Sequence, residues 1–292
     1  MRAIIIVFLG AVSYGILSTI VKIAYGEGFT VQEVSGAQFG IAACIMWSIA
    51  FIYLKKQLKK VTNRQKISLL LVGITSGLTG LFYYTALQSI PASLAIILLF
   101  QFTWIGVLFD AIFNKKRLTK VTIASLLFLL IGTILASGVT SNLSKNIDNY
   151  GIFLGLLSAF TYSMFVFFSG KVSEEVPAVL KSTWIVTGGM ITVFILYPPN
   201  FLYNGSLLNG LWFYGLLLAL FGPILPTLAF TYGVPKIGPG LATILGAAEL
   251  PTVIIASTVI LKEDVSVIQW IGILIILVAI ALPQIHLIRH PK

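Results

Sequence analysis

Ten apolar runs, each long enough to cross a bilayer as a helix, occupy most of this chain of 292 residues. A membrane-spanning helix needs about 20 mostly apolar residues, whereas a spanning strand needs about 10 residues of alternating polarity. The runs do not alternate. We place them at residues 3–24, 33–54, 67–88, 91–113, 121–139, 150–170, 178–197, 210–233, 237–261 and 266–287. The chain is therefore predicted to be an all-α integral membrane protein with ten transmembrane helices.

The composition excludes a water-soluble protein. Hydrophobic residues make up 58% of the chain and charged residues only 10%, against about 25% charged residues in a typical soluble domain. The formal net charge of +10 is typical of nucleic-acid binders, but here the basic residues lie in short segments between apolar runs. We interpret them as topology signals and expect no nucleic-acid partner. Cys44 is the single cysteine and no Cys/His cluster exists, so we expect no metal and no cofactor.

The basic residues also predict the orientation. Cytoplasmic loops of membrane proteins are enriched in lysine and arginine. If the N-terminus is cytoplasmic, then all but three of the 19 lysines and arginines fall on the cytoplasmic side, and the exceptions are Lys22, Lys145 and Lys262. We therefore predict a multi-pass protein of the plasma membrane with both termini in the cytoplasm.

The two halves of the chain resemble each other at an offset near 147 residues. Residues 90–98 and 237–245 are identical at five of nine positions, and residues 11–14 echo residues 159–162. We predict a first five-helix repeat over 1–140 and a second over 150–288. Because five is odd, the second repeat must enter the membrane with the opposite polarity. Inverted repeats of this kind are common in secondary transporters, whose substrate site lies near the midplane between the halves.

With these features the chain resembles the EamA family of the drug/metabolite transporter superfamily. The resemblance covers nearly the whole chain and rests on the five-plus-five arrangement, on the Pro91-Ala92-Ser93 entry to the fourth helix and on Leu261-Lys262-Glu263-Asp264 after the ninth. The chain departs from the family at Lys115-Lys116-Arg117, where Gly-Glu-Arg is frequent, and at Thr103-Trp104, where many members have a proline. The resemblance implies export of small metabolites or amino-acid-like compounds, with no ATP-binding part.

Glu249 is the first candidate for the site. It lies near the middle of the ninth run, two residues before Pro251, and an acid at that depth costs roughly 2.5–3.5 kcal/mol. Such a residue usually faces the bundle interior or a water-filled path, and burial favours its neutral form. Pro251 should leave the carbonyl of Ala247 without its helical partner. Glu249 is then either a proton-coupling or amine-binding carboxyl, or a protonated side chain that bonds neighbouring helices.

Proline and glycine mark two further spans. Pro223 and Pro226 interrupt the eighth span and predict either a hinge or cavity wall, or a simple kink. Together with Pro251 they are the predicted helix breaks. Gly73, Gly77 and Gly80 lie at the corresponding depth of the third span, and their spacing also fits close helix packing.

Four more side chains are candidate substrate-binding residues. Gln101 and Trp104 lie one turn apart in the fourth span and share a face, which we expect to point inward because an amide is poorly satisfied in lipid. Trp104 either stacks on a substrate or fills the core. Tyr14 and Tyr162 hold matching places in the first and sixth spans, deep enough to line a cavity.

Other polar residues have structural interpretations. Tyr84 and Tyr232 end the third and eighth spans, as interfacial anchors do. Gln38 lies between two glycines of the second span and is expected at a helix contact. Asp110 lies near the cytoplasmic end of the fourth span, and we expect it to meet the basic loop around Lys115.

These features favour a secondary transporter that exports a small organic solute by alternating access, with protons as a second partner suggested by Glu249 alone. The alternatives are a membrane-embedded enzyme and a scaffold or sensor subunit. An enzyme would need clustered histidine or acidic groups, and the chain has one mid-membrane carboxyl and no internal histidine. A scaffold or sensor would need an output surface, and the loops are short. We therefore expect a carrier rather than an enzyme, with a small molecule and the lipid bilayer as partners.

Overall fold

The structure is a computed structural model that describes residues 1–90, 92–138, 148–262 and 264–289. Pro91, Glu263 and the predicted repeat boundary at residue 140 lie outside these ranges. Within them the chain forms helices and no strand. Eight helical stretches are long and apolar enough to cross a membrane, and two apolar helices at Lys120–Ala136 and Val267–Pro283 are shorter. Together they correspond to the ten predicted helices.

The helices follow one another with short connections. Their bounds are α1 Arg2–Gly26, α2 Val31–Tyr53, α3 Lys55–Leu58, α4 Asn63–Ser89, α5 Ala92–Leu99, α6 Phe102–Phe113, α7 Lys120–Ala136, α8 Asn149–Lys171, α9 Ala178–Leu196, η2 Asn200–Leu202, η3 Leu207–Leu211, α10 Trp212–Ala219, η4 Leu220–Ile224, α11 Leu225–Ile237, α12 Pro239–Gly246, α13 Glu249–Ile260 and α14 Val267–Arg289. Side-chain caps at several helix starts satisfy exposed N–H groups. Thr30 with Glu33 and Thr62 with Gln65 form complete capping boxes at α2 and α4.

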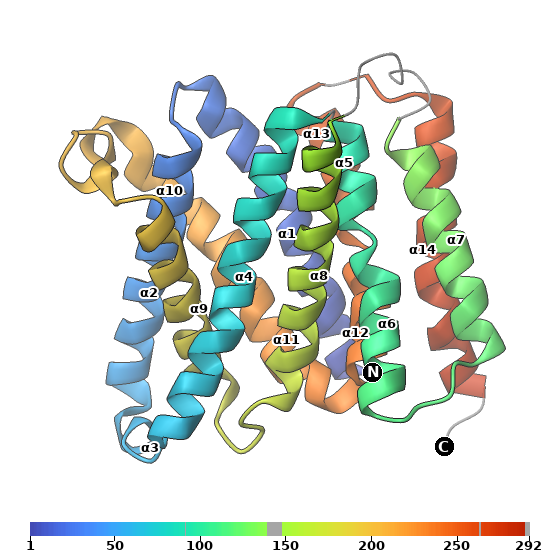
Figure 1. The fold of residues 1–292 in the computed structure, drawn as a ribbon, viewed down its shortest axis with the longest axis horizontal. Coiled ribbons are helices and arrows are strands. Elements are labelled where there is room, and N and C mark those ends of the chain that lie inside the picture. The colour runs from blue at the N-terminus through green and yellow to red at the C-terminus, as the bar shows by residue number, and fades with distance from the viewer. Residues whose placement is uncertain (91, 139–147, 263, 290–292) are drawn as a thin grey trace.

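The two halves run through the bundle in opposite directions. The start of α1 and the end of α14 lie at the same end of the bundle, which we call the terminus end, and the opposite end is the far end (Figure 1). The first helix, α1, starts at the terminus end, whereas α8, the first helix of the second half, starts at the far end. This opposite polarity is the one that an odd number of helices per repeat requires.

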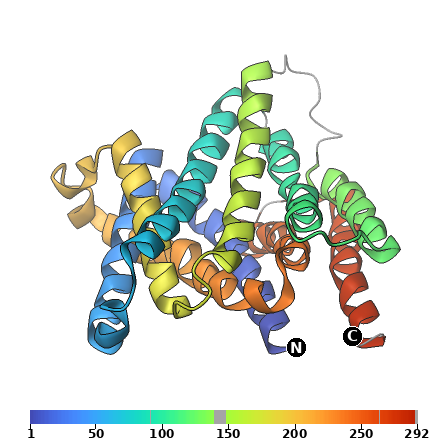
Figure 2. The same cartoon turned by 60° about the horizontal axis from the view of Figure 1, so that its bottom comes forward.

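The halves interlock rather than lie side by side. α1 of the first half packs along α11 of the second, and α4 of the first packs along α8 of the second, which is the reciprocal pair. α2 packs along α9 in the same way. The fifth helices of the two halves, α7 and α14, pair with each other at one edge (Figures 1 and 2). Every part of the interior is therefore built from both repeats.

Glycines set the closest helix crossing. A Cβ on Gly73 of α4 would lie 2.0 Å from the carbonyl oxygen of Ile185 on α9, and a Cβ on Gly77 would lie 2.8 Å from Cβ of Thr192. Close helix packing, one of the two interpretations of these glycines, is therefore a role of Gly73 and Gly77. α4 runs without interruption from Asn63 to Ser89, so the third span holds no counterpart to the break in the eighth.

The eighth span is interrupted at its first predicted proline. A π-helical turn, η4, contains Pro223 and separates α10 from α11. Pro226 is the second residue of α11, where a proline is tolerated. The hydroxyl of Ser13 on α1 donates to the carbonyl oxygen of Phe221 at 2.8 Å, so a side chain of the other repeat satisfies a carbonyl of the irregular turn.

Candidate functional site

The ninth span breaks immediately before Glu249. Ala247 and Ala248 form a tight turn in which the N–H of Ala248 donates to Leu245 at 3.1 Å and the N–H of Leu250 donates to Ala247 at 3.3 Å. These are bonds to the third preceding residue, as in a 3₁₀ turn. As expected, Pro251 offers the Ala247 carbonyl no helical donor, and the N–H of Leu250 donates to this carbonyl instead.

The break changes the position of both predicted residues. Pro251 becomes the third residue of α13, in a first turn where no intrahelical donor is missing. Glu249 becomes the first residue of α13. The partial positive charge of a helix N-terminus favours a carboxylate there. The chain thus places its mid-membrane acid at a location that moderates the cost of a negative charge.

The fourth span breaks at the equivalent place. The N–H of Gln101 donates to Leu98 at 3.1 Å, and the N–H of Thr103 donates to Phe100 at 3.2 Å. Adding the offset of 147 to all four residue numbers reproduces the two bonds of the ninth span. The matching interruptions of the two halves therefore lie in the fourth and ninth spans, and Phe102 occupies the place of Glu249.

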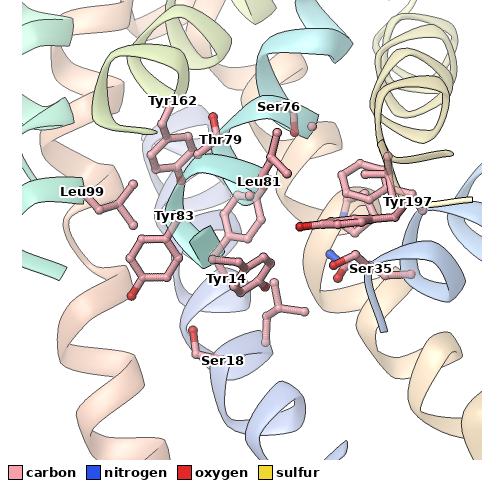
Figure 3. A pocket seen from close by; sticks show the side chains of 18 of the residues that line it. Tyr14, Ser18, Ser35, Ser76, Thr79, Leu81, Tyr83, Leu99, Tyr162 and Tyr197 are labelled. Atoms are coloured by element: carbon pink, nitrogen blue, oxygen red, sulfur yellow. The ribbon is translucent and has the colours of Figure 1, made fainter. Parts of the chain in front are cut away.

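A cavity lies next to Glu249 and is lined by both repeats (Figure 3). Its volume is about 130 Å³. The lining residues are Tyr14, Leu17, Ser18, Ser35, Gln38, Phe39, Ser76, Gly77, Thr79, Gly80, Leu81, Tyr83, Tyr84, Leu99, Tyr162, Val193, Leu196, Tyr197, Pro223 and Glu249. Of the predicted helix breaks only Pro223 is among them, whereas Pro226 and Pro251 are buried in helix packing.

Three of the predicted site residues meet in this cavity. Glu249 is half-buried in the wall, and the hydroxyl of Tyr162 lies 3.4 Å from its carboxyl oxygen. The rings of Tyr14 and Tyr162 meet edge to face with centroids 6.0 Å apart. Residues from matching places of the two repeats therefore converge beside the acid.

Gln101 and Trp104 lie elsewhere. They line a separate pocket of about 290 Å³ against α7, and the side chain of Trp104 is 42% exposed. The amide of Gln101 donates to the carbonyl oxygen of Ile97 at 2.8 Å, and the indole N–H of Trp104 donates to the amide oxygen of Gln101 at 2.7 Å. Gln101 has no need to point inward, because its own helix satisfies it. The structure does not bring these two residues to Glu249.

Several cavity residues were not predicted. Tyr83 and Tyr84 at the end of α4 line the cavity, with ring centroids 6.0 Å apart, although Tyr84 was expected to anchor the chain at the membrane surface. Tyr197 and Gln38 line it as well. Figure 3 shows Tyr83 with Tyr14 and Tyr162 on one side and Tyr197 on the other. Ser76, Thr79 and Tyr83 follow a helical stripe, and this polar spacing was the available signal.

The two broken spans contact each other at the terminus end of the bundle. Gly106 of α6 presses against Thr243 of α12. The carboxylate of Asp110 accepts from the backbone N–H of Gly240 at 3.3 Å and from Nζ of Lys116 at 3.1 Å. The expected contact between Asp110 and the basic loop is confirmed, with Lys116 as the partner. The side chain of Asp110 thus ties the end of α6 to the start of α12.

No group of three His, Cys, Asp or Glu side chains suited to a metal ion occurs in the part of the chain that the structure describes. The cavity residues offer one carboxyl, several phenols, hydroxyls and an amide. Such a set can bind and orient a solute, and its single carboxyl can exchange a proton.

Comparisons with known proteins agree with this architecture. A sequence profile of the EamA-like transporter family matches residues 1–138 and again residues 149–283. An inner membrane transporter of Salmonella typhimurium, YicL, is 24% identical over 256 residues, which span 86% of this chain and 84% of the relative. A protein of known crystal structure superposes with a TM-score of 0.81 at 18% identity, over 100% of this chain and 99% of that chain. The last likeness concerns the fold alone.

Proposed function

Because this chain belongs to the EamA-like transporter family, we propose that it exports a small organic metabolite across the plasma membrane by alternating access through the central cavity. The observation that supports this proposal most directly is the position of Glu249. Its carboxyl is half-buried at a helix break, in the wall of a cavity that both repeats line. Broken helices at the repeat interface are where secondary transporters bind substrates and coupling ions.

We propose that the terminus end faces the cytoplasm. Nearly all lysines and arginines belong to segments at that end, and cytoplasmic loops carry this excess. The cavity-lining residues extend from the middle of the bundle, such as Tyr14 and Tyr162, to the far end, such as Ser35 near the start of α2 and Tyr84 near the end of α4. In this orientation the cavity would face outward, and we propose that the structure represents an outward-facing conformation.

The moving parts would be the two repeats, residues 1–140 and residues 150–288. Alternating access would require α6 and α12 to separate at the terminus end. The contacts that would break include the hydrogen bond from the N–H of Gly240 to Asp110 and the close packing of Gly106 on Thr243. The π-helical turn at Pro223, which lines the cavity, is the proposed hinge, because irregular helical turns can absorb a change in direction.

Proton coupling is part of the proposal. An unpaired carboxylate inside a membrane is costly, so Glu249 would hold a proton in at least one step of the cycle. The proton would leave when substrate binds and return when substrate departs.

Efflux from proteoliposomes tests the proposed transport. Vesicles with the purified protein would be loaded with a defined mixture of amino acids, amines, nucleosides and organic acids, and the external medium analysed by mass spectrometry. We expect at least one compound to leave faster than from protein-free vesicles. Release of every compound at the protein-free rate would contradict the proposed transport.

A pair of glycine variants locates the path. Gly80 lies in the cavity wall, and a Cβ there would meet only Tyr84, at 3.7 Å. Gly80→Phe should fill the cavity without a backbone clash and abolish the efflux. Gly26→Phe is the control, because a Cβ on Gly26 at the exposed end of α1 meets nothing within 4 Å. Equal efflux by the two variants would place the path outside this cavity.

A further inference from the structure

We infer that the cavity beside Glu249 selects small organic cations, such as amines and quaternary ammonium compounds. This inference rests on the proposed function and names its substrate class. It is carried by three properties of the cavity wall, namely its charge, its aromatic content and its size.

The first property is charge. Glu249 is the only charged side chain among the lining residues that the structure describes, and none of them is Lys, Arg or His. Its one hydrogen bond to another side chain in these residues is the 3.4 Å contact with the hydroxyl of Tyr162, so most of its acceptor capacity is unused. An acid without a cationic partner in a membrane interior avoids being a lone charge by holding a proton or a bound cation.

The second property is aromatic content. Six lining side chains are aromatic, and these are Tyr14, Phe39, Tyr83, Tyr84, Tyr162 and Tyr197. They come from five different helices or helix ends, so they surround the space rather than form one face. The face of an aromatic ring attracts a cation, and aromatic cages are the common protein device for binding quaternary ammonium groups. An anion would meet ring faces, phenol oxygens and a carboxyl, with no basic group to offset its charge.

The third property is size. The volume of about 130 Å³ is below the roughly 300–1,000 Å³ of sites for drug-sized ligands. The cavity therefore fits a compact cation with a few carbon atoms better than a large amphipathic drug.

The binding of a cation and the protonation of Glu249 are therefore linked. The titratable groups that face Glu249 are Tyr14 on α1, Tyr83 and Tyr84 on α4 and Tyr162 on α8. All are phenols and are neutral near pH 7, so Glu249 alone changes charge there. A cation needs the ionised carboxyl and displaces its proton, and cation binding should strengthen as the pH rises.

Three probes of nearly the same shape test the inference. Choline carries a positive charge, 3,3-dimethylbutan-1-ol replaces its nitrogen by carbon and is neutral, and 3,3-dimethylbutanoate is an anion. Equilibrium binding would be measured on the detergent-purified full chain by calorimetry. We expect saturable binding of choline that is at least about tenfold tighter than that of the other two. Equal affinity for choline and the neutral alcohol would overturn the inference.

Matched variants assign the selectivity to named groups. Glu249→Gln should weaken choline binding by about tenfold or more and remove its pH dependence, whereas Glu249→Asp should keep that dependence. Glu175→Gln is the control, because Glu175 is an exposed acid on the α8–α9 connection. Tyr84→Phe should retain most of the affinity and Tyr84→Leu should lose it, because the ring face binds the cation. Unchanged binding by a folded Glu249→Gln protein would also overturn the inference.

The two proposals fail in different ways. If the loaded vesicles release only neutral or anionic solutes, then the transport function holds and the cation selectivity is wrong. If choline binds as expected and no solute leaves the vesicles, then the cavity is a cation site and the transport proposal is wrong.

Discussion

The fourth and ninth spans break at the same place, but opposite kinds of side chain occupy the two breaks. The backbone bonds around residues 100–101 and 247–248 are equivalent at the repeat offset of 147. The residue that follows is Phe102 in one half and Glu249 in the other. The break is therefore a property of the repeated fold, whereas the carboxyl belongs to one half only.

Phe102 and Glu249 differ in burial, as expected for an apolar and an acidic side chain. Phe102 is fully buried, with its ring centroid 4.5 Å from that of Tyr162. Glu249 is half-buried, with its carboxyl 3.4 Å from the hydroxyl of the same tyrosine. Tyr162 thus presents its ring to the apolar break and its hydroxyl to the acidic one. Phe102 is therefore enclosed by apolar packing, whereas Glu249 lines the central cavity.

An acid at both breaks should have the largest effect on the protein. Phe102→Glu should destabilise the protein by more than about 3 kcal/mol, because it removes a buried ring and leaves a carboxyl without water or a partner. Little monodisperse protein should be recovered, with a strongly lowered melting temperature in detergent.

Two further variants control this experiment. Phe102→Leu keeps the site apolar and should fold with a smaller loss, and Glu249→Gln should change the melting temperature little, because the amide remains in a half-buried polar wall. If Phe102→Glu were as stable as Glu249→Gln, the two breaks would be equivalent in environment and the comparison would be wrong.

The second contrast lies one turn further along each span. A Cβ on Gly106 would lie 2.2 Å from Cγ2 of Thr243, whereas its equivalent in the other half, Val253, carries a side chain and is partly exposed. Gly106→Val should therefore force α6 and α12 apart and destabilise the protein by about 1–3 kcal/mol. Val253→Ala is the control and should cost less than about 1 kcal/mol.

Thermal melting in detergent measures both variants, and choline binding measures the state of the cavity. Equal melting temperatures for the two variants would show that the contact between Gly106 and Thr243 is loosely packed. The two breaks would then not differ in packing. If Gly106→Val folds, its altered closure should change the affinity for choline, while Val253→Ala should not.

The sequence was sufficient for the architecture and for part of the site. Ten apolar runs, an odd number of helices per repeat and the offset of 147 predicted the all-α fold, because membrane burial makes span length and backbone satisfaction almost decisive. Glu249 could be found for the same reason, since an acid at that depth has few acceptable surroundings.

The breaks of the fourth and ninth spans could not be located from the sequence, and the rest of the site depends on them. Pro251 suggested an interruption after Glu249, but the turn lies before it at two alanines, and its counterpart at Phe100 and Gln101 contains no proline. Gln101 was expected to point inward because an amide is poorly satisfied in lipid. The actual turn lets its amide bond to its own helix, and only the fold brings the distant Tyr84 and Tyr197 into the cavity.

The smallest change in stability is expected for a substitution at Gln101, where the two breaks differ by one hydrogen bond. In the ninth span the carbonyl of Ile244 accepts from the N–H of Ala247 at 3.2 Å. In the fourth span the equivalent carbonyl of Ile97 accepts from the side-chain amide of Gln101 instead. Gln101→Leu should therefore leave this carbonyl and the indole N–H of Trp104 unpaired, at a cost of about 1 kcal/mol.

Choline binding should be unchanged in Gln101→Leu, because the residue lies outside the cavity. Trp104→Phe removes only the indole donor and should cost less than Gln101→Leu by thermal melting. If Gln101→Leu lost choline binding without losing stability, then Gln101 would act on the substrate path and not as a structural hydrogen-bond donor to Ile97. The two breaks would then differ in backbone as well as in side chain.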